Sequence, residues 1–240
     1  VMRALLVFFC SLIYTSLFFV SVVVFGSFLL LPSPLVNESL KWQTVNAFVK
    51  TNVCLCKTLC RLDYEVVGLK NIPKKPCIVF LKHSSVYEMF FALFFFQPSS
   101  YVAKHELTLV PIIRGAIKAL KCIPVKRGLG RSEVNKVLSL GERYLADGRW
   151  LVVCPEGTRV KHGETRKYGV SGALLSQGTK TPVLPVAHNA GLFWGRRSLI
   201  KSPGKITFSI GPPIETLGLE TDDINDLAQA WIEDEIKKLS

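Results

Sequence analysis

The chain has 240 residues, of which 49% are apolar, and it carries 30 Lys and Arg against 18 Asp and Glu, for a formal net charge of +12. Once an apolar amino-terminal segment is set aside, this length provides for one globular domain of about 180 to 200 residues with a sizeable core. The basic residues are scattered and no nucleic-acid motif is recognised, which argues against nucleic acid as a partner. Anionic lipid headgroups or a phosphorylated substrate account for the charge better, although a solvated basic face explains most of the lysines.

The amino terminus contains an uncharged run, dominated by Leu, Phe, Val and Ile, from Ala4 to Leu31. This run exceeds the roughly 20 residues that a helix needs to cross a bilayer core. A secretory signal peptide would have a shorter apolar region and a cleavage site of small residues, whereas Pro32-Ser33-Pro34 ends this run. The mixed apolar and basic residues from Trp42 to Cys60 suit a membrane interface. We expect residues 1–60 to anchor the chain, either as a full span or as an interfacial hairpin.

A histidine follows the first strand-like run of the remaining chain, residues 61–240. Pro76 to Leu81 is short, apolar and rich in strand formers, and His83 comes directly after it. Ser85 and Glu88 have the spacing of a capping box, which would start a helix at Ser85 and leave His83 in the preceding turn. There the imidazole could take a proton from an alcohol, and Glu88 could reach back to orient it. The plainer alternative is a helix cap beside an ordinary turn residue.

An apolar block from Met89 to Phe96 follows this turn. It is too short to cross a membrane and predicts a buried core helix. A wall for an acyl chain, or a surface that dips into a membrane, is the functional alternative.

A second strand-like run, Trp150 to Cys154, leads directly into Pro155-Glu156-Gly157-Thr158-Arg159. In open α/β sheets, ligands bind at the carboxyl ends of strands. Gly157 permits a backbone conformation closed to most residues, Glu156 accepts hydrogen bonds, and Arg159 has a planar fork suited to phosphate. A turn with a structural salt bridge is the alternative interpretation.

Strand-like and helical segments alternate along the chain, which predicts an α/β domain. The expected strands are Cys77–Leu81, Ser100–Ala103, Cys122–Val125, Leu151–Cys154, Val183–Ala187 and Lys205–Ile210, and further helices are expected at Ser132–Ala146, Ser171–Gln177 and Asp222–Leu239.

Seven cysteines raise the question of disulfides, zinc or a thiol nucleophile. Their odd count and wide spacing favour reduced thiols, and Cys54-Leu55-Cys56 is too tight for the usual zinc-ligand pair. The chain has no G-x-S-x-G elbow, and no cysteine is bracketed in the sequence by a suitable histidine and acid. A covalent acyl-enzyme is therefore not favoured, and no metal is implied.

Four motifs in this order resemble those of the glycerolipid acyltransferases typified by 1-acyl-sn-glycerol-3-phosphate acyltransferase. The family's first motif is His, four residues, then Asp, and His83 with Glu88 matches it with a longer acid. The second ends in arginine and corresponds to Ile123–Arg127. The third reads Phe-Pro-Glu-Gly-Thr-Arg and corresponds to Cys154–Arg159, with Cys in place of Phe; the fourth corresponds to Val183–Gly191, in which His188 could line the pocket or be buried and hydrogen bonded.

The resemblance implies a mixed sheet flanked by helices, preceded by a membrane helix or a two-helix membrane motif. It implies that His83 is the general base and that Glu88 orients it, while the rest of the site binds substrate. The substrate-binding residues that it implies are Lys104, Arg127, Glu156, Gly157, Thr158 and Arg159.

The implied reaction is transfer of a fatty acyl group from an acyl thioester to the sn-2 hydroxyl of lysophosphatidic acid, giving phosphatidic acid. The hydroxyl would attack the donor directly, and the donor would be acyl-CoA or acyl-carrier protein, with no cofactor. In a bacterium, the enzyme would lie at the inner membrane with its site facing the cytoplasm. Acylation of another lysophospholipid or lipid-linked alcohol, or a catalytically silent lipid-binding protein, remains an alternative.

Overall fold

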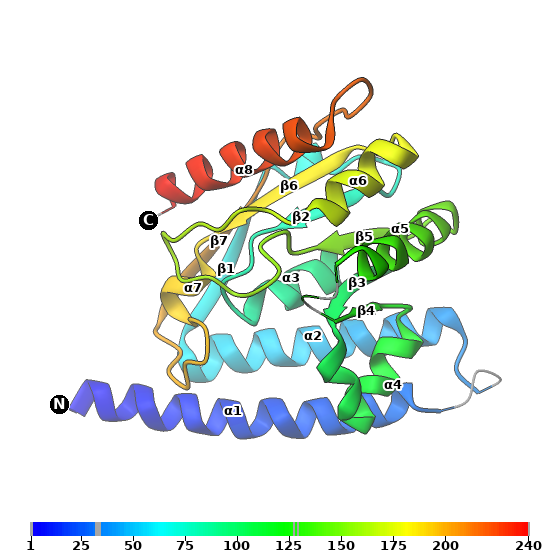
Figure 1. Cartoon of the computed structure of the whole chain (residues 1–240). Coiled ribbons are helices and arrows are strands. Elements are labelled where there is room, and N and C mark those ends of the chain that lie inside the picture. Colours follow the sequence, from blue (N-terminus) through cyan, green and yellow to red (C-terminus); the bar gives the residue numbers. More distant parts are fainter. Residues whose placement is uncertain (1, 32–34, 127, 129, 240) are drawn as a thin grey trace.

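The computed structural model describes residues 2–31, 35–126, 128 and 130–239 (Figure 1). Within these residues seven strands form one sheet in the order β1-β7-β6-β2-β5-β3-β4. The five strands from β6 to β4 are mutually parallel, β7 is antiparallel to β6, and β1 is parallel to β7. The strands are β1 (Leu62–Val67), β2 (Ile78–Leu81), β3 (Ser99–Lys104), β4 (Ile123–Val125), β5 (Trp150–Val153), β6 (Val183–His188) and β7 (Gly204–Ile210).

Helices cover both faces of the sheet (Figure 1). Val79 and Leu81 of β2 pack in one buried cluster with α2 and α3, whereas Ile78 and Phe80 pack in another with α5, α6 and α8. Because both faces of β2 are buried, its sequence is a continuous apolar run. The helices are α1 (Met2–Leu29), α2 (Glu38–Cys60), α3 (Tyr87–Phe95), α4 (Pro111–Ala119), α5 (Arg131–Ala146), α6 (Val170–Thr179), α7 (Ala190–Phe193) and α8 (Thr221–Lys238), with short 3₁₀ turns at η1 (Leu69–Asn71) and η2 (His105–Leu109).

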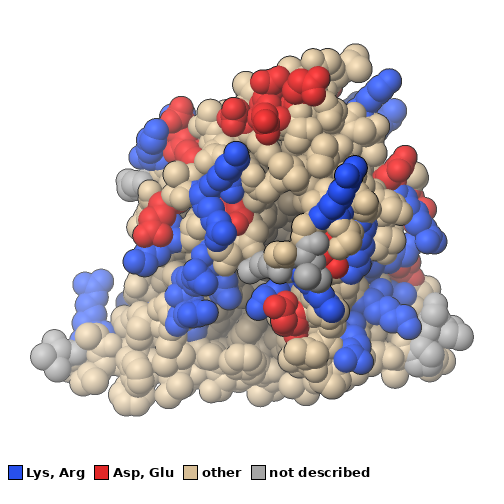
Figure 2. Space-filling view, in the orientation of Figure 1, with Lys and Arg blue, Asp and Glu red and all other residues tan. Residues whose placement is uncertain are grey.

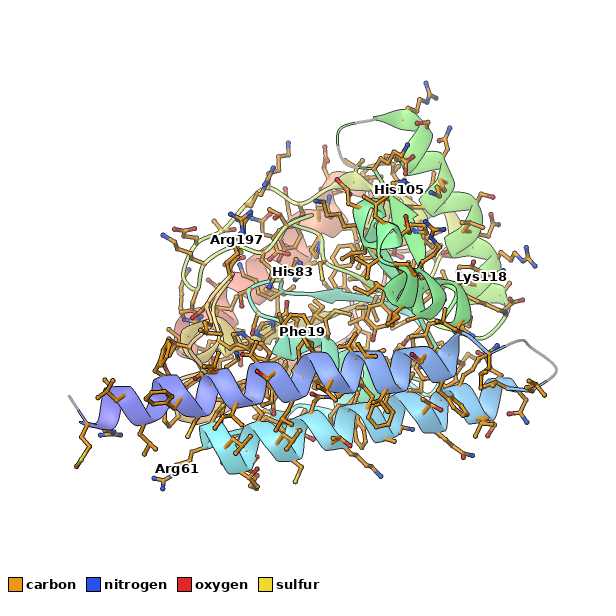
Figure 3. The ribbon with its side chains drawn as sticks, turned by 90° about the horizontal axis from the view of Figure 1, so that it is seen from below. Phe19, Arg61, His83, His105, Lys118 and Arg197 are labelled. Atoms are coloured by element: carbon orange, nitrogen blue, oxygen red, sulfur yellow. The ribbon has the colours of Figure 1, made fainter. Side chains whose placement is uncertain are left out.

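The long helices α1 and α2 lie side by side along the base of the molecule (Figures 1 and 3). Asn52 of α2 donates a hydrogen bond to Ser21 of α1 at 3.0 Å. Gly26 brings α1 so close to α4 that an added Cβ would lie 2.3 Å from Ile112 Cγ2. Within the described residues, α1 is the one helix long and apolar enough to cross a membrane, and its outer side is largely exposed, consistent with membrane association.

The predicted α/β fold with a mixed sheet is confirmed, and each predicted strand agrees with an observed strand to within one residue at either end. The expected helix start at Ser85 is wrong by two residues, because α3 begins at Tyr87. The sequence pattern also gave no indication of β1 or α4. Strand β1 lies at the sheet edge, where partly exposed polar side chains interrupt the apolar pattern.

Candidate active site

His83 and Glu88 lie where β2 gives way to α3. Nδ1 of His83 is 2.7 Å from Oε1 of Glu88, and the other Glu88 oxygen accepts the Ser85 N–H at 2.8 Å. The Glu88 side chain is fully buried, whereas the His83 side chain is 20% exposed. A carboxylate fixed in this way orients the imidazole and leaves Nε2 for proton transfer. The bond to Ser85 is one half of the expected capping box, so the motif serves the histidine as well as the helix start.

His188 lies behind Glu88, at the end of β6. Its Nε2 is 2.7 Å from the Lys82 carbonyl oxygen and 3.5 Å from Glu88 Oε2, while its Nδ1 accepts the Ala190 N–H at 3.2 Å. These contacts place the proton on Nε2, which donates to the carbonyl. Burial lowers the pKa of His188, despite the opposing attraction of Glu88. His188 is therefore a neutral, buried and hydrogen-bonded residue next to Glu88. Of the two alternatives expected for His188, this is the buried one.

A buried lysine connects the site to the carboxy-terminal helix. Lys82 is 1% exposed, and its Nζ lies 2.6 Å from Glu233 Oε1 of α8 and 3.5 Å from Glu156 Oε1. It also donates to the Glu164 carbonyl at 3.1 Å. Glu156 in turn accepts the His83 N–H at 3.4 Å, and burial raises the pKa of Glu156 while Lys82 opposes this effect. Lys82 and Glu233 were missed from the sequence because only the folded chain brings them together.

The turn after β5 is attached to the histidine segment. Gly157 has φ +67°, a conformation that favours glycine, and its N–H donates to the Cys154 carbonyl at 3.0 Å. The N–H of Val160 then donates to the His83 carbonyl at 2.8 Å. Thr158 and Arg159, both partly exposed, lie between these two anchor points and are thereby held beside His83.

Of the predicted phosphate-binding residues, one lies further from His83 and another falls outside the described residues. Lys104 ends β3, which lies two strands away from β2, so Lys104 is at the same carboxyl end of the sheet as His83. Its Nζ pairs with Glu106 at 3.3 Å. Arg127 falls outside the described residues. The structure thus brings His83, Glu88 and the 156–159 turn together, and it places Lys104 two strands away at the carboxyl end of the sheet.

Comparison with known proteins identifies the family of this chain. An acyltransferase family model matches residues 63–189. The 1-acyl-sn-glycerol-3-phosphate acyltransferase of Pseudomonas aeruginosa is 36% identical over 201 residues, which cover 80% of this chain and 78% of that protein. The chain belongs to the acyltransferase family. An acyltransferase with the same name from Borreliella burgdorferi is 25% identical over 202 residues, which cover 80% of this chain and 79% of that protein.

The fold of this acyltransferase is also shared with a solved structure. The crystal structure of the 1-acyl-sn-glycerophosphate acyltransferase from Thermotoga maritima superposes with a TM-score of 0.79, at 22% identity, over 99% of this chain and 96% of that one. The resemblance inferred from the four motifs is therefore confirmed at the level of the family and of the fold.

One cysteine of the acyltransferase, Cys154, follows β5, the strand beside the one that His83 follows, and it is partly exposed. Burial lowers the pKa of His83, but its interaction with Cys154, together with Glu88, raises it to about 10. Strands β2 and β5 pair in parallel with Phe80 opposite Val153, so that His83 and Cys154 follow neighbouring strands. That pairing brings together residues that are far apart in the sequence.

Charge on the acyltransferase surface is unevenly distributed. Figure 2 shows Lys and Arg side chains on both sides of a hollow in one face, above a base without charged side chains over most of its length. Such a face attracts phosphorylated ligands and anionic headgroups. Across residues 2–31, 35–126, 128 and 130–239, no group of three or more His, Cys, Asp and Glu could hold a metal ion.

Proposed function

We propose that this acyltransferase transfers a fatty acyl group from an acyl thioester to the sn-2 hydroxyl of lysophosphatidic acid, forming phosphatidic acid in phospholipid biosynthesis. The observation that carries the proposal is the His83–Glu88 pair, a partly exposed imidazole held by a buried carboxylate. Relatives that bear the name 1-acyl-sn-glycerol-3-phosphate acyltransferase support the choice of acceptor.

His83 acts as the general base. Its Nε2 removes the proton from the sn-2 hydroxyl while the oxygen attacks the carbonyl carbon of the thioester. Glu88 keeps the proton of the neutral ring on Nδ1 and stabilises the imidazolium that forms. The imidazolium then gives its proton to the departing thiolate, so the base is regenerated in each cycle.

The acceptor phosphate binds beside this base. Arg159 is held next to the bond between Val160 and His83, and its planar fork suits bidentate contact with phosphate. Glu156, Gly157 and Thr158 shape this turn, and Glu156 does so through the His83 backbone and Lys82. Lys104, at the end of β3, and Arg127, which falls outside the described residues, complete the proposed set of substrate-binding residues.

Residues 1–60 form the proposed membrane anchor, and residues 61–240 form the catalytic domain. The Lys201 N–H donates to Ser11 Oγ near one end of α1, and Gly26 packs against Ile112 near the other. Helix α1 is therefore fixed to the base of the domain along its length, which favours an interfacial hairpin over a full span. Its outward face would lie among lipid chains; large apolar residues exposed on α1 include Leu5, Phe9, Ile13, Phe19, Val20 and Val24.

This arrangement suits a water-soluble acyl donor and a membrane-embedded acceptor. The donor is acyl-CoA or acyl-carrier protein, and in a bacterium both are supplied on the cytoplasmic side of the inner membrane. The proposed orientation therefore places the catalytic domain on that side.

The test is acyl transfer by purified protein, with acyl-CoA and acyl-carrier protein as donors and a panel of lysolipids as acceptors, for wild type and for His83→Ala. We expect activity on lysophosphatidic acid that is lost in the variant, while both proteins bind vesicles equally. Activity confined to another lysolipid would show that this lysolipid, and not lysophosphatidic acid, is the acceptor. Vesicle binding without transfer by either protein would instead indicate a catalytically silent lipid-binding protein.

A further inference from the structure

Helix α8 presents a row of polar side chains to the segment 165–169, which follows the 156–159 turn. Asn225, Gln229 and Glu233 are spaced by four residues, so they lie along one face of the helix. Asn225 donates a hydrogen bond of 3.4 Å to this segment, and Gln229 donates one of 3.0 Å. Glu233, the third of the row, contacts the buried lysine of the site. Three successive turns of α8 are therefore attached to the surroundings of the catalytic histidine.

Glu233 is the closest ionic partner of that lysine, Lys82. Oε1 of Glu233 lies 2.6 Å from Lys82 Nζ, whereas Oε1 of Glu156 lies 3.5 Å away. The lysine side chain is only 1% exposed, and a buried ammonium needs an ionised partner. Burial raises the pKa of Glu156, which favours its neutral form. Glu233 is therefore the main counter-ion of Lys82.

Lys82 directly precedes His83, so its contacts limit where the histidine can lie. The N–H of Lys82 donates to the Val186 carbonyl at 3.0 Å, and its own carbonyl accepts a hydrogen bond from His188 Nε2 at 2.7 Å. Both partners belong to β6. Strand β6 thus holds the main chain of this lysine while α8 holds its side chain through Glu233, and the position of the next residue depends on both.

A second connection to the histidine passes through Glu156. The oxygen of this carboxylate that faces Lys82 Nζ at 3.5 Å also accepts the His83 N–H at 3.4 Å. One carboxylate oxygen therefore joins the lysine to the main chain of the base. A shift of the ammonium would displace this oxygen as well.

We propose that Glu233 is a positioning residue for acyl transfer: through Lys82 it keeps His83 aligned with the hydroxyl that the base deprotonates. Glu233 acts through the lysine and takes no part in the proton transfer itself. The inference rests on the proposed function, in which the imidazole must meet the hydroxyl at hydrogen-bond distance. It makes the carboxy-terminal helix a part of the catalytic apparatus, although 151 residues separate Glu233 from Lys82 in the sequence.

Glu235, two residues further along α8, provides a matched control. Its side chain is 19% exposed, against 18% for Glu233. It also attaches α8 to the sheet, because it accepts a hydrogen bond from Ser209 of β7 at 2.9 Å, and it pairs with Lys238. Neither of these partners belongs to the site. Glu235→Gln therefore loosens α8 without removing a contact of Lys82.

The experiment measures kcat and KM for lysophosphatidic acid, together with denaturant unfolding, for wild type, Glu233→Gln and Glu235→Gln. An amide keeps the shape of the carboxylate but lacks the charge that holds Lys82. We expect kcat of Glu233→Gln to fall by about 10- to 100-fold, the cost of a small misplacement of a catalytic group, with KM nearly unchanged. Glu235→Gln should keep the wild-type kcat even where it loses as much stability. Glu233→Asp, which retains the charge on a shorter side chain, should recover part of the loss.

A double variant tests whether the effect passes through the lysine. If it does, Lys82→Met combined with Glu233→Gln should lower kcat no further than Lys82→Met alone, because the group on which Glu233 acts is already gone. A loss in the double variant equal to the product of the two single losses would contradict this route.

Amide hydrogen exchange gives a second readout that does not depend on activity. Glu233→Gln should speed exchange in the peptides that contain His83 and residues 165–169, whereas Glu235→Gln should not. Wild-type kcat and exchange in Glu233→Gln, or equal losses of kcat in the two variants, would overturn the inference and leave the proposed function intact. Wild-type protein that transfers no acyl group to any lysolipid would instead count against the proposed function, and the exchange measurement would still decide whether Glu233 positions His83.

Discussion

The helix pair α1 and α2 exposes apolar side chains and buries a few polar ones. By contrast, the carboxyl end of the sheet, around His83, buries charged side chains against one another. On α1, Phe19 faces outward while Ser11 and Ser21 are buried, which suits contact with lipid. At the carboxyl end of the sheet, Lys82 and Glu88 are buried beside the partly exposed His83. Buried charges destabilise a fold unless they are paired, so their presence indicates chemistry. Membrane binding and catalysis should therefore respond to different substitutions.

The largest difference between the effect on catalysis and the effect on membrane binding is expected from Glu88→Gln. An amide cannot supply the negative charge that stabilises the His83 imidazolium, so kcat should fall by about 10²–10⁴-fold, the range typical of general acid–base catalysis. Vesicle binding should not change. The matched control is Glu65→Gln, which removes an exposed carboxylate on β1 that pairs with Lys205. Equal losses in both variants, measured by steady-state kinetics, would contradict the assigned role of Glu88.

The next largest effect concerns stability. Lys82→Met removes the cation between Glu156 and Glu233, and loss of one partner from a buried ion pair costs about 3–5 kcal/mol of unfolding free energy. Lys161→Met breaks an exposed pair with Glu164 and should cost less than about 1 kcal/mol. Denaturant unfolding in a common detergent measures both variants. Similar unfolding free energies for the two would show that the buried network is not a structural link to α8.

A smaller effect is expected at the membrane surface. Phe19 is 62% exposed on α1, and burying such a side chain in lipid contributes about 1.5–3 kcal/mol, so Phe19→Asp should weaken vesicle binding by about tenfold or more. Leu217, which is 76% exposed in the segment between β7 and α8, provides the control Leu217→Asp. Sedimentation with liposomes should separate the two variants. Unchanged binding by Phe19→Asp would remove α1 from the proposed interface.

The smallest expected effect is a shift in pH dependence. Burial lowers the pKa of His83, and Cys154 together with Glu88 raises it to about 10, with Glu156, Lys82 and His188 also nearby. A base is active when it is neutral, so kcat/KM should rise with pH toward that value. Cys154→Ala removes the interaction with the thiol and should move the midpoint to lower pH. An unchanged midpoint, in profiles taken with saturating donor, would show that Cys154 does not influence the base.

The sequence allowed the central strands to be predicted because β2 and β5 are buried on both faces and have uninterrupted apolar runs. It did not reveal β1, whose side chains are partly exposed at the sheet edge. The pairing of His83 with Glu88 is local and could be anticipated from spacing. The contact of Lys82 with Glu233 depends on the docking of α8, and the pairing of β2 with β5 depends on the fold of the whole sheet; spacing alone encodes neither.

The central claim is that His83 performs the chemistry while α1 and α2 hold the protein at the membrane. The most direct measurement is single-turnover acyl transfer to lysophosphatidic acid in vesicles, with wild type and His83→Gln both fully membrane-bound. We predict that the variant loses about 10²–10⁴-fold in the transfer rate at unchanged binding, as expected for loss of a general base. A variant that transfers acyl groups at the wild-type rate would contradict the account.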